Sequence, residues 1–99
     1  MYKVRVMLSI GNTLKECREL KGISLGQLSK DSGVNKSYLS KIENDKRDPS
    51  LNSLNSLCEA IGIPLSIFIL LAEDTTDDNF SELTDLLKIT ARKAISESQ

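Results

Sequence analysis

Residues 24–43 constrain the fold of this chain more than any other stretch of its sequence. Apolar residues recur there at helical spacing over two short segments, 25–32 and 36–44. Gly33 lies between the segments and permits a left-handed backbone at no steric cost. Val34 is an apolar residue that can plug the turn beneath both segments. We therefore expect two short helices that meet at a tight glycine corner.

The second of these helices has one apolar and one polar face. Leu39 and Ile42 fall on the same side at about 100° per residue, and the opposite side carries short hydroxyls and two lysines. Short side chains let a helix approach base edges, and Lys can donate to guanine O6 and N7. A helix-turn-helix corner places its second helix in the major groove of DNA. The candidate base contacts are Lys36, Ser37 and Lys41.

A solvated helix surface would also look polar, so the neighbouring residues decide between the two interpretations. Lys46 and Arg47 follow the second helix directly, where they could hold the DNA backbone without specifying sequence. These loop cations, together with the glycine corner, favour the interpretation as a DNA-binding face over that of a solvated helix surface. Tyr38 lies at the flank of the polar face, where its hydroxyl could reach a phosphate or its ring could cover the edge of the core.

Helical spacing continues between the other turn signals. Further helices are expected over 9–21, 51–61, 64–71 and 80–96, with Ser9 capping the first. The apolar stripe of the last one comprises Phe80, Leu83, Leu87, Thr90 and Ala94, widened by Leu86 and Ile89. Residues 1–8 alternate apolar and charged side chains. This is a short strand pattern, but we interpret the segment as a loose N-terminal arm lying on the core, with an edge strand pairing between two chains as the alternative.

Composition argues against an enzyme. A chain of 99 residues can hold one core, and this chain contains no His. The commonest general base and the imidazole metal ligands are therefore missing, and two cysteines cannot close a zinc site by themselves. We expect no catalytic residue, no metal and no cofactor.

Two further features bear on location. Cys17 and Cys58 lie on apolar stripes and are expected to be buried thiols in a reducing cytosol. The longest apolar run, 67–72, is too short to cross a bilayer, and no signal peptide is visible. We expect a cytoplasmic protein without a membrane partner.

The net charge of −1 hides an asymmetry along the chain. Residues 1–49 carry ten Lys and Arg against six Asp and Glu, whereas residues 50–99 carry three against eight. A positive front half suggests a basic face for a polyanion. The sequence pI of 5.4 therefore does not exclude DNA binding.

The chain resembles the Cro/phage-repressor-like helix-turn-helix family, also called the xenobiotic-response-element family. The resemblance covers about sixty of the 99 residues, from Ile10 to Ile69. Its matching positions are Ile10-Gly11, Leu14, Arg18, Gly22, Ser24, Leu28, Gly33-Val34, the run from Ser37 to Asn44, Pro49-Ser50-Leu51, Leu54, Leu57, the run from Ala60 to Ile63, and Phe68.

The resemblance implies an all-α protein: a compact five-helix, lambda-repressor-like DNA-binding domain at 9–72, here with an additional C-terminal helix. It implies a transcription regulator, usually dimeric, that binds double-stranded DNA. Arg18 and Glu43 match positions that usually form a structural ion pair between the first and third helices. Positions where backbone contacts are common in the family are Ser24, Asn35, Tyr38, Ser40, Lys46 and Arg47.

Three residues depart from the family pattern. Leu25 stands where the family often has a DNA-contacting Gln, so that contact is lost. Ser29 replaces the usual Ala and keeps a small side chain at the helix crossing. Asp45 replaces the usual Gly after Asn44, and because Asp tolerates the left-handed region less well, the loop is expected to bend differently.

The segment 64–71 is apolar nearly all round, which is typical of a helix buried on both sides. Leu65 and Phe68 can seal the monomer core, which would leave Ile67, Leu70 and Leu71 in water. We expect a two-fold dimer interface at these three residues. The alternative is that the last helix folds back over its own domain and covers them.

The preferred function is a homodimeric, sequence-specific repressor that reads a palindromic operator with helix 36–44. A controller protein of a restriction–modification system has the same build and can activate, so the sign of regulation stays open. An antitoxin-type interaction module is another alternative. Its protein partner would dock on the tail, residues 73–99, which comprises an acidic linker and the last helix.

Overall fold

The computed structural model describes residues 6–75 and 78–97, and the side chains of 8–73 and 85–97. Over these residues the chain forms helices and one short two-stranded ribbon. The strands are β1 (Val6–Leu8) and β2 (Glu73–Thr75). The helices are α1 (Ile10–Lys21), α2 (Leu25–Ser32), α3 (Lys36–Glu43), α4 (Leu51–Ile61), α5 (Leu65–Ala72) and α6 (Asp78–Glu97).

The all-α, lambda-repressor-like class with an additional C-terminal helix is confirmed, and the ribbon is its one addition. The bounds of α1 to α5 lie within one residue of those expected, and α6 is extended at both ends. The N-terminal expectation is wrong for residues 6–8. They form a strand that pairs in antiparallel fashion with β2 of the same chain, so they are not a loose arm. Residues 1–5 lie outside the described part.

Three of the helices are capped at their N-terminus by a side chain. The Ser24 hydroxyl accepts from the Gln27 N–H at 3.0 Å, and Asn35 Oδ1 accepts from two N–H groups of α3. The expected cap at Ser9 is wrong, because its side chain makes no cap hydrogen bond. Its backbone N–H instead donates to the Ala72 carbonyl at 2.9 Å, next to the ribbon. The Ser9 backbone is thus anchored next to the ribbon, while its side chain leaves the first turn of α1 uncapped.

The core is assembled from all five helices of the domain. Both cysteines are free and buried within it, as expected. Burial raises the pKa of the Cys17 thiol to about 12 and that of Cys58 to about 11, so both thiols stay protonated and unreactive. The fully buried side chains are Leu14, Cys17, Leu28, Leu39, Ile42, Leu57, Cys58, Ile61 and Phe68.

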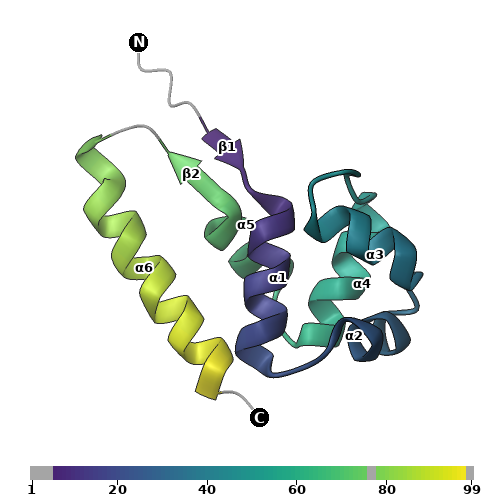
Figure 1. The fold of residues 1–99 in the computed structure, drawn as a ribbon. Helices are drawn as coiled ribbons and strands as arrows, with labels where there is room; N and C mark the ends of the chain where they lie inside the picture. Colours follow the sequence, from purple (N-terminus) through teal and green to yellow (C-terminus); the bar gives the residue numbers. More distant parts are fainter. Residues whose placement is uncertain (1–5, 76–77, 98–99) are drawn as a thin grey trace.

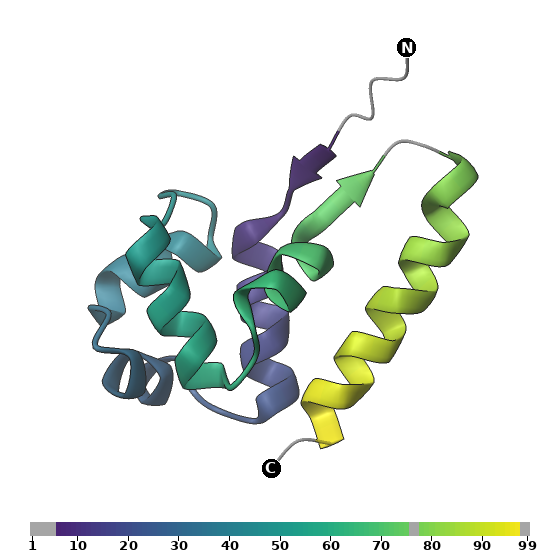
Figure 2. The same cartoon turned by 180° about the vertical axis from the view of Figure 1, so that it is seen from behind.

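Figures 1 and 2 show α2, α3 and α4 at one end of the molecule and α6 at the other, with α1 and α5 between them. α6 packs against α1 and α5, so the last helix does fold back over its own domain. Leu71 lies on α5, which packs against both α1 and α6; it is only 4% exposed, and its expected place in water is wrong. Ile67 and Leu70 are half-buried.

The expected apolar stripe of α6 is also wrong where its side chains are described. Ile95 is buried and Ala91 packs against the core, whereas Leu87, Thr90 and Ala94 are exposed. Phe80 and Leu83 lie outside the described side chains. The helix is therefore rotated relative to the expectation, with much of its apolar surface facing outward.

Across residues 6–75 and 78–97, no single helix is both long and apolar enough to cross a bilayer. Only α4 and α5 taken together reach that length and apolar composition, across a bend of 103°, and both helices supply core residues.

Candidate nucleic-acid interface

The corner between α2 and α3 is built as the sequence predicts. Gly33 has a φ of 75°, in the left-handed region, and its N–H donates to the Ser29 carbonyl at 3.0 Å. Val34 is buried beneath the turn. The Ser29 hydroxyl also donates to the Val34 carbonyl at 2.6 Å. Sequence reasoning credited Ser29 with small size alone and missed this bond, which fastens α2 to the turn.

α3 separates its apolar and polar residues onto opposite faces. Leu39 and Ile42 are buried in the core. The three candidate base contacts, Lys36, Ser37 and Lys41, are exposed. The open face therefore combines two cations with short hydroxyls, and Lys36 Nζ approaches the first turn of α2 near Gly26. Donors of this kind match the acceptors on guanine in the major groove.

The two capping residues are partly committed to the protein itself. Asn35 Oδ1 accepts from Ser37 at 2.9 Å and from Tyr38 at 3.2 Å. Ser24 Oγ likewise acts as an acceptor at the start of α2. A phosphate contact by either side chain would therefore use its donor group. Ser40 is half-buried on α3.

The loop after α3 begins near Asp45, one of the three residues that depart from the family pattern. Asp45 has a φ of 58°, and its N–H donates to the Ile42 carbonyl at 3.1 Å. The Lys46 N–H donates to the Lys41 carbonyl at 2.8 Å, which completes the helix end. Asp45 thus adopts the left-handed conformation that a Gly would adopt. The expectation that Asp45 would avoid this region is therefore wrong.

Tyr38 fastens this loop to the helix. Its hydroxyl donates to the Asp48 carbonyl at 3.2 Å and accepts from the Ser50 N–H at 3.3 Å. Its half-buried ring packs against the core, and the Arg47 guanidinium lies 5.5 Å from the ring centroid. The ring therefore covers the core edge, one of the two roles considered. The hydroxyl instead positions the segment that carries Arg47 and the start of α4.

The expected ion pair between Arg18 and Glu43 is present. Arg18 Nε and Nη2 donate to the two carboxylate oxygens at 2.9 and 3.1 Å. The pair is largely buried, and Arg18 also donates to the Ile23 carbonyl at 3.0 Å. The hydrogen bond to Glu43 is the main reason that the pKa of Arg18 is raised. The pair holds α1 against the end of α3.

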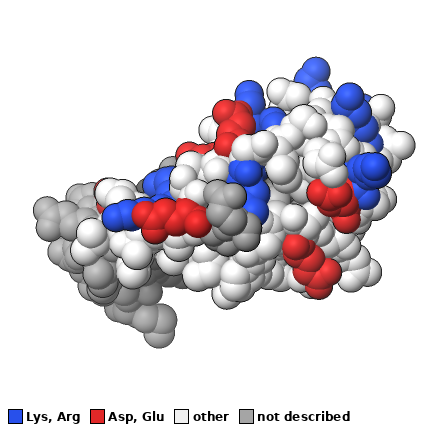
Figure 3. Space-filling view, turned by 90° about the horizontal axis from the view of Figure 1, so that it is seen from below, with Lys and Arg blue, Asp and Glu red and all other residues white. Residues whose placement is uncertain are grey.

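Charged side chains are unevenly distributed around the candidate interface. Figure 3 shows Lys and Arg side chains gathered at the end formed by α2, α3 and α4, with acidic groups among them. Exposed cations from this part of the chain are Lys30, Lys36, Lys41, Lys46 and Arg47. Because Glu43 is buried in its ion pair, its charge does not offset these cations at the surface.

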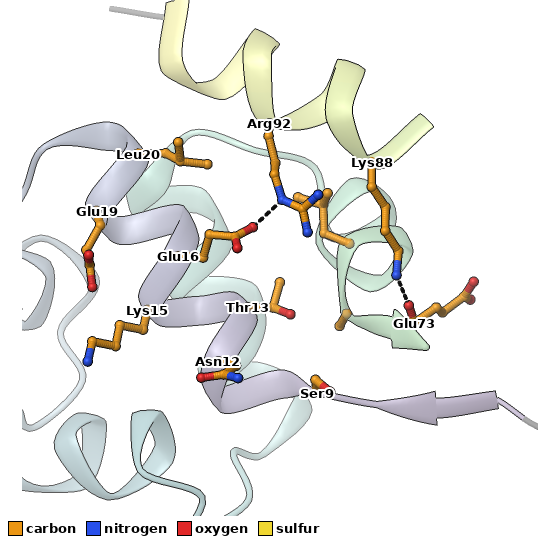
Figure 4. Close-up of a pocket in the computed structure, with 12 residues that line it drawn as sticks. Ser9, Asn12, Thr13, Lys15, Glu16, Glu19, Leu20, Glu73, Lys88 and Arg92 are labelled. Atoms are coloured by element: carbon orange, nitrogen blue, oxygen red, sulfur yellow. Dashed lines mark hydrogen bonds and ion pairs between the residues drawn. The ribbon is translucent and has the colours of Figure 1, made fainter. Parts of the chain in front are cut away.

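A separate polar groove of about 630 Å³ lies between α1, the start of β2 and α6. Figure 4 shows Lys88 directed at Glu73 and Arg92 directed at Glu16 across it. Its lining combines three basic with three acidic side chains, so it offers no net charge to attract a polyanion. Among the described residues, no cluster of His, Cys, Asp or Glu is placed to hold a metal ion.

A recognition helix held at a glycine corner over a five-helix core defines a helix-turn-helix DNA-binding domain. The chain belongs to the Cro/phage-repressor-like helix-turn-helix family. A family model described as "Helix-turn-helix" matches residues 14–68. The family comprises DNA-binding transcriptional regulators, a class that is not enzymatic.

Three relatives illustrate the similarity. The immunity repressor protein of Bacillus phage phi105 is 29% identical over 85 residues, which is 82% of this chain and 59% of the repressor. The transcriptional regulator SinR of Bacillus licheniformis is 31% identical over 93 residues, 91% of this chain and 84% of SinR. The regulator ClgR of Mycobacterium tuberculosis is 33% identical over 61 residues, 62% of this chain and 54% of ClgR. The chain thus spans only about half the length of the phage repressor and of ClgR.

Proposed function

We propose that this protein is a homodimeric repressor that recognises a palindromic operator by placing α3 in the major groove. The observation that carries the proposal is the exposed polar face of α3, whose opposite face is buried. The helix is held at both ends, by the Asn35 cap and by the Arg18–Glu43 pair. A rigid helix with outward donors is the arrangement that direct readout of bases requires.

The exposed side chains divide into two roles. Lys36, Ser37 and Lys41 contact base edges and so determine sequence preference. Contacts to the phosphate backbone fix the position of the protein on the duplex without specifying sequence. These come from the donor groups of Ser24, Asn35 and Ser40 and from the loop cations Lys46 and Arg47. Tyr38 acts through the loop, because its hydroxyl is engaged there.

A dimer explains how so short a helix achieves specificity. Each α3 spans eight residues and can reach only a few base pairs. Two copies related by a two-fold axis read two half-sites, which doubles the recognised sequence. Half-sites one turn apart lie about 34 Å from centre to centre. Because a repressor must share a compartment with its operator, whether phage, plasmid or chromosomal, the proposal implies a cytoplasmic protein.

Selection of bound sequences from random duplex DNA, with the full chain, tests the proposal. We expect enrichment of a palindrome whose half-sites have a fixed spacing. Recovery of unrelated sequences, or failure to bind any duplex at low ionic strength, would overturn it. Placing the selected site within a reporter promoter then tests the sign of regulation. Repression is expected, and activation would favour a restriction–modification controller.

A protein-docking tail is the second candidate function, favoured by the exposed apolar residues of α6. Deleting residues 74–99 separates the two. An antitoxin-type tail that only docks a partner is dispensable for DNA binding, so the truncated chain would still bind the selected operator. Loss of operator binding by a truncated chain that remains folded would instead tie the tail to DNA recognition.

A further inference from the structure

α6 turns Ala91, Ile95 and two cations toward the domain, yet it exposes several large apolar residues on its outer side. On the inner side, Lys88 donates to the Glu73 carbonyl and Arg92 pairs with Glu16. On the outer side, Leu86 is 60% exposed and Ile89 is 59% exposed. A surface helix of a monomer normally turns such large apolar residues toward the core. The outer side of α6 therefore has the composition of a surface that another molecule covers.

The two charged residues beside this apolar surface have opposite signs and lie equally far from its centre. Asp85, Ile89 and Lys93 are separated by four residues each, so they form one stripe along the helix. All three are exposed, and Leu86 lies beside Ile89 on the next turn. The stripe thus has an acidic end, an apolar centre and a basic end, with Ile89 midway between the two charges.

We propose that α6 pairs with α6 of a second copy of this chain, antiparallel, about a two-fold axis at Ile89. In that arrangement the two Ile89 side chains meet at the axis, and each Leu86 packs beside them. Asp85 lies opposite the second copy's Lys93, and Lys93 opposite the second copy's Asp85. The proposal deepens the homodimer of the proposed function by naming its interface.

Charge complementarity selects this occupant and this orientation. A stripe that is acidic at one end and basic at the other complements itself when it is reversed, as a two-fold interface requires. A parallel pair would oppose like charges at both ends. Figures 1 and 2 place α6 at the end of the molecule away from α3, so pairing through α6 leaves both recognition helices uncovered.

Light scattering and sedimentation equilibrium of the full chain across the micromolar range test the interface. The wild type is expected at twice 11.0 kDa, and Ile89→Asp at 11.0 kDa. Leu51→Asp is the matched control, because Leu51 is 70% exposed on α4, outside α6, and its replacement should leave the dimer intact. Circular dichroism of each variant verifies that it is folded.

Charge reversal gives the sharper test, because it introduces no polar group at the apolar centre. Asp85→Lys and Lys93→Asp should each weaken self-association at least tenfold by opposing like charges. Both the double variant D85K/K93D and an equimolar mixture of the two single variants should restore it, the mixture as a heterodimer.

Three results would overturn the inference: a monomeric wild type, a dimeric Ile89→Asp, or no restoration by the double variant. If Leu70→Asp dissociates the dimer and Ile89→Asp does not, the interface lies on α5. Binding of each variant to a single half-site is measured in parallel. A monomeric protein that still binds the half-site would refute the interface but not the DNA-binding proposal. A dimeric protein that binds no duplex would refute the DNA-binding proposal but not the interface.

Discussion

The Arg18 guanidinium and the Glu43 carboxylate form a two-pronged ion pair in which the side chains are only 14% and 6% exposed. Arg18 comes from α1 and Glu43 is the last residue of α3, so the pair fixes the orientation of the proposed recognition helix. An unpaired charge in so buried a site would destabilise the folded state.

Glu43→Leu is therefore expected to lower the free energy of unfolding by about 3 kcal/mol, because Arg18 loses its counter-charge. The double variant Arg18→Met/Glu43→Leu is the control. Its free energy of unfolding should fall clearly less than that of Glu43→Leu, because neither charge remains. Urea denaturation of the three chains measures the difference. Equal losses in the single and double variants would mean that packing, and not charge, accounts for the effect.

Two lysines are predicted to differ in how they act on DNA. Lys36→Ala should weaken specific binding by about 1–3 kcal/mol and relax the preference at one base pair. Lys46→Ala should weaken binding to all sequences alike. It should also reduce the slope of log affinity against log salt concentration by about one, the value for one phosphate contact. Mobility shifts against the selected operator, single-base variants and unrelated DNA at several salt concentrations separate the two. Identical behaviour would refute the assignment of the α3 face.

Tyr38→Phe removes the two hydrogen bonds to Asp48 and Ser50 and keeps the ring beneath Arg47. We expect a loss of about 1 kcal/mol in folding stability, the usual contribution of such bonds. DNA affinity should fall for all sequences equally, because the loop with Arg47 loses its positioning while α3 keeps its base-reading face. A changed base preference would show instead that the hydroxyl itself reads DNA.

Thermal stability is expected to fall at alkaline pH because of the two buried thiols. Burial raises the pKa of Cys17 to about 12 and of Cys58 to about 11, from a usual value of 9.0. Since the folded protein retains these protons to higher pH than the unfolded chain, their contribution is complete below about pH 9. It is lost as the pH rises toward 11 and 12. A Cys17→Ala/Cys58→Ala variant should show a flatter decline than the wild type over that range, and parallel curves would contradict this account.

Local signals explain why most of the domain was predictable from sequence. The bounds of α2 and α3 depend on Ser24, Gly33 and Asn35, all of which act on backbone groups within a few residues. The ion pair of Arg18 with Glu43 spans 25 positions and was anticipated only through the family resemblance.

The predictions that failed depend on contacts between distant parts of the chain. Ser9 is tied through its N–H to the Ala72 carbonyl beside the β1–β2 ribbon, and its ψ of 67° differs from the extended backbone of the capping residues Ser24 and Ser50. In α6, Ile95 and Ala91 face the core, and beside them Arg92 and Lys88 pair with Glu16 and the Glu73 carbonyl. Apolar periodicity alone carries no information about such polar anchors, so it selected the wrong face.

Among the five glycines, Gly11 lies closest to neighbouring atoms. A Cβ at Gly11 would lie 2.5 Å from the Ile42 carbonyl oxygen and 2.4 Å from Asp45 Oδ1. Gly11→Ala should therefore destabilise the fold by about 1–3 kcal/mol, because α1 must move away from the end of α3. Asp45→Gly alone should stabilise by about 1 kcal/mol by relieving the left-handed conformation. In the double variant the contact with the Ile42 carbonyl remains, so Asp45→Gly should rescue Gly11→Ala only in part, as measured by urea denaturation. Full rescue would mean that the Asp45 side chain alone excludes a Cβ at position 11.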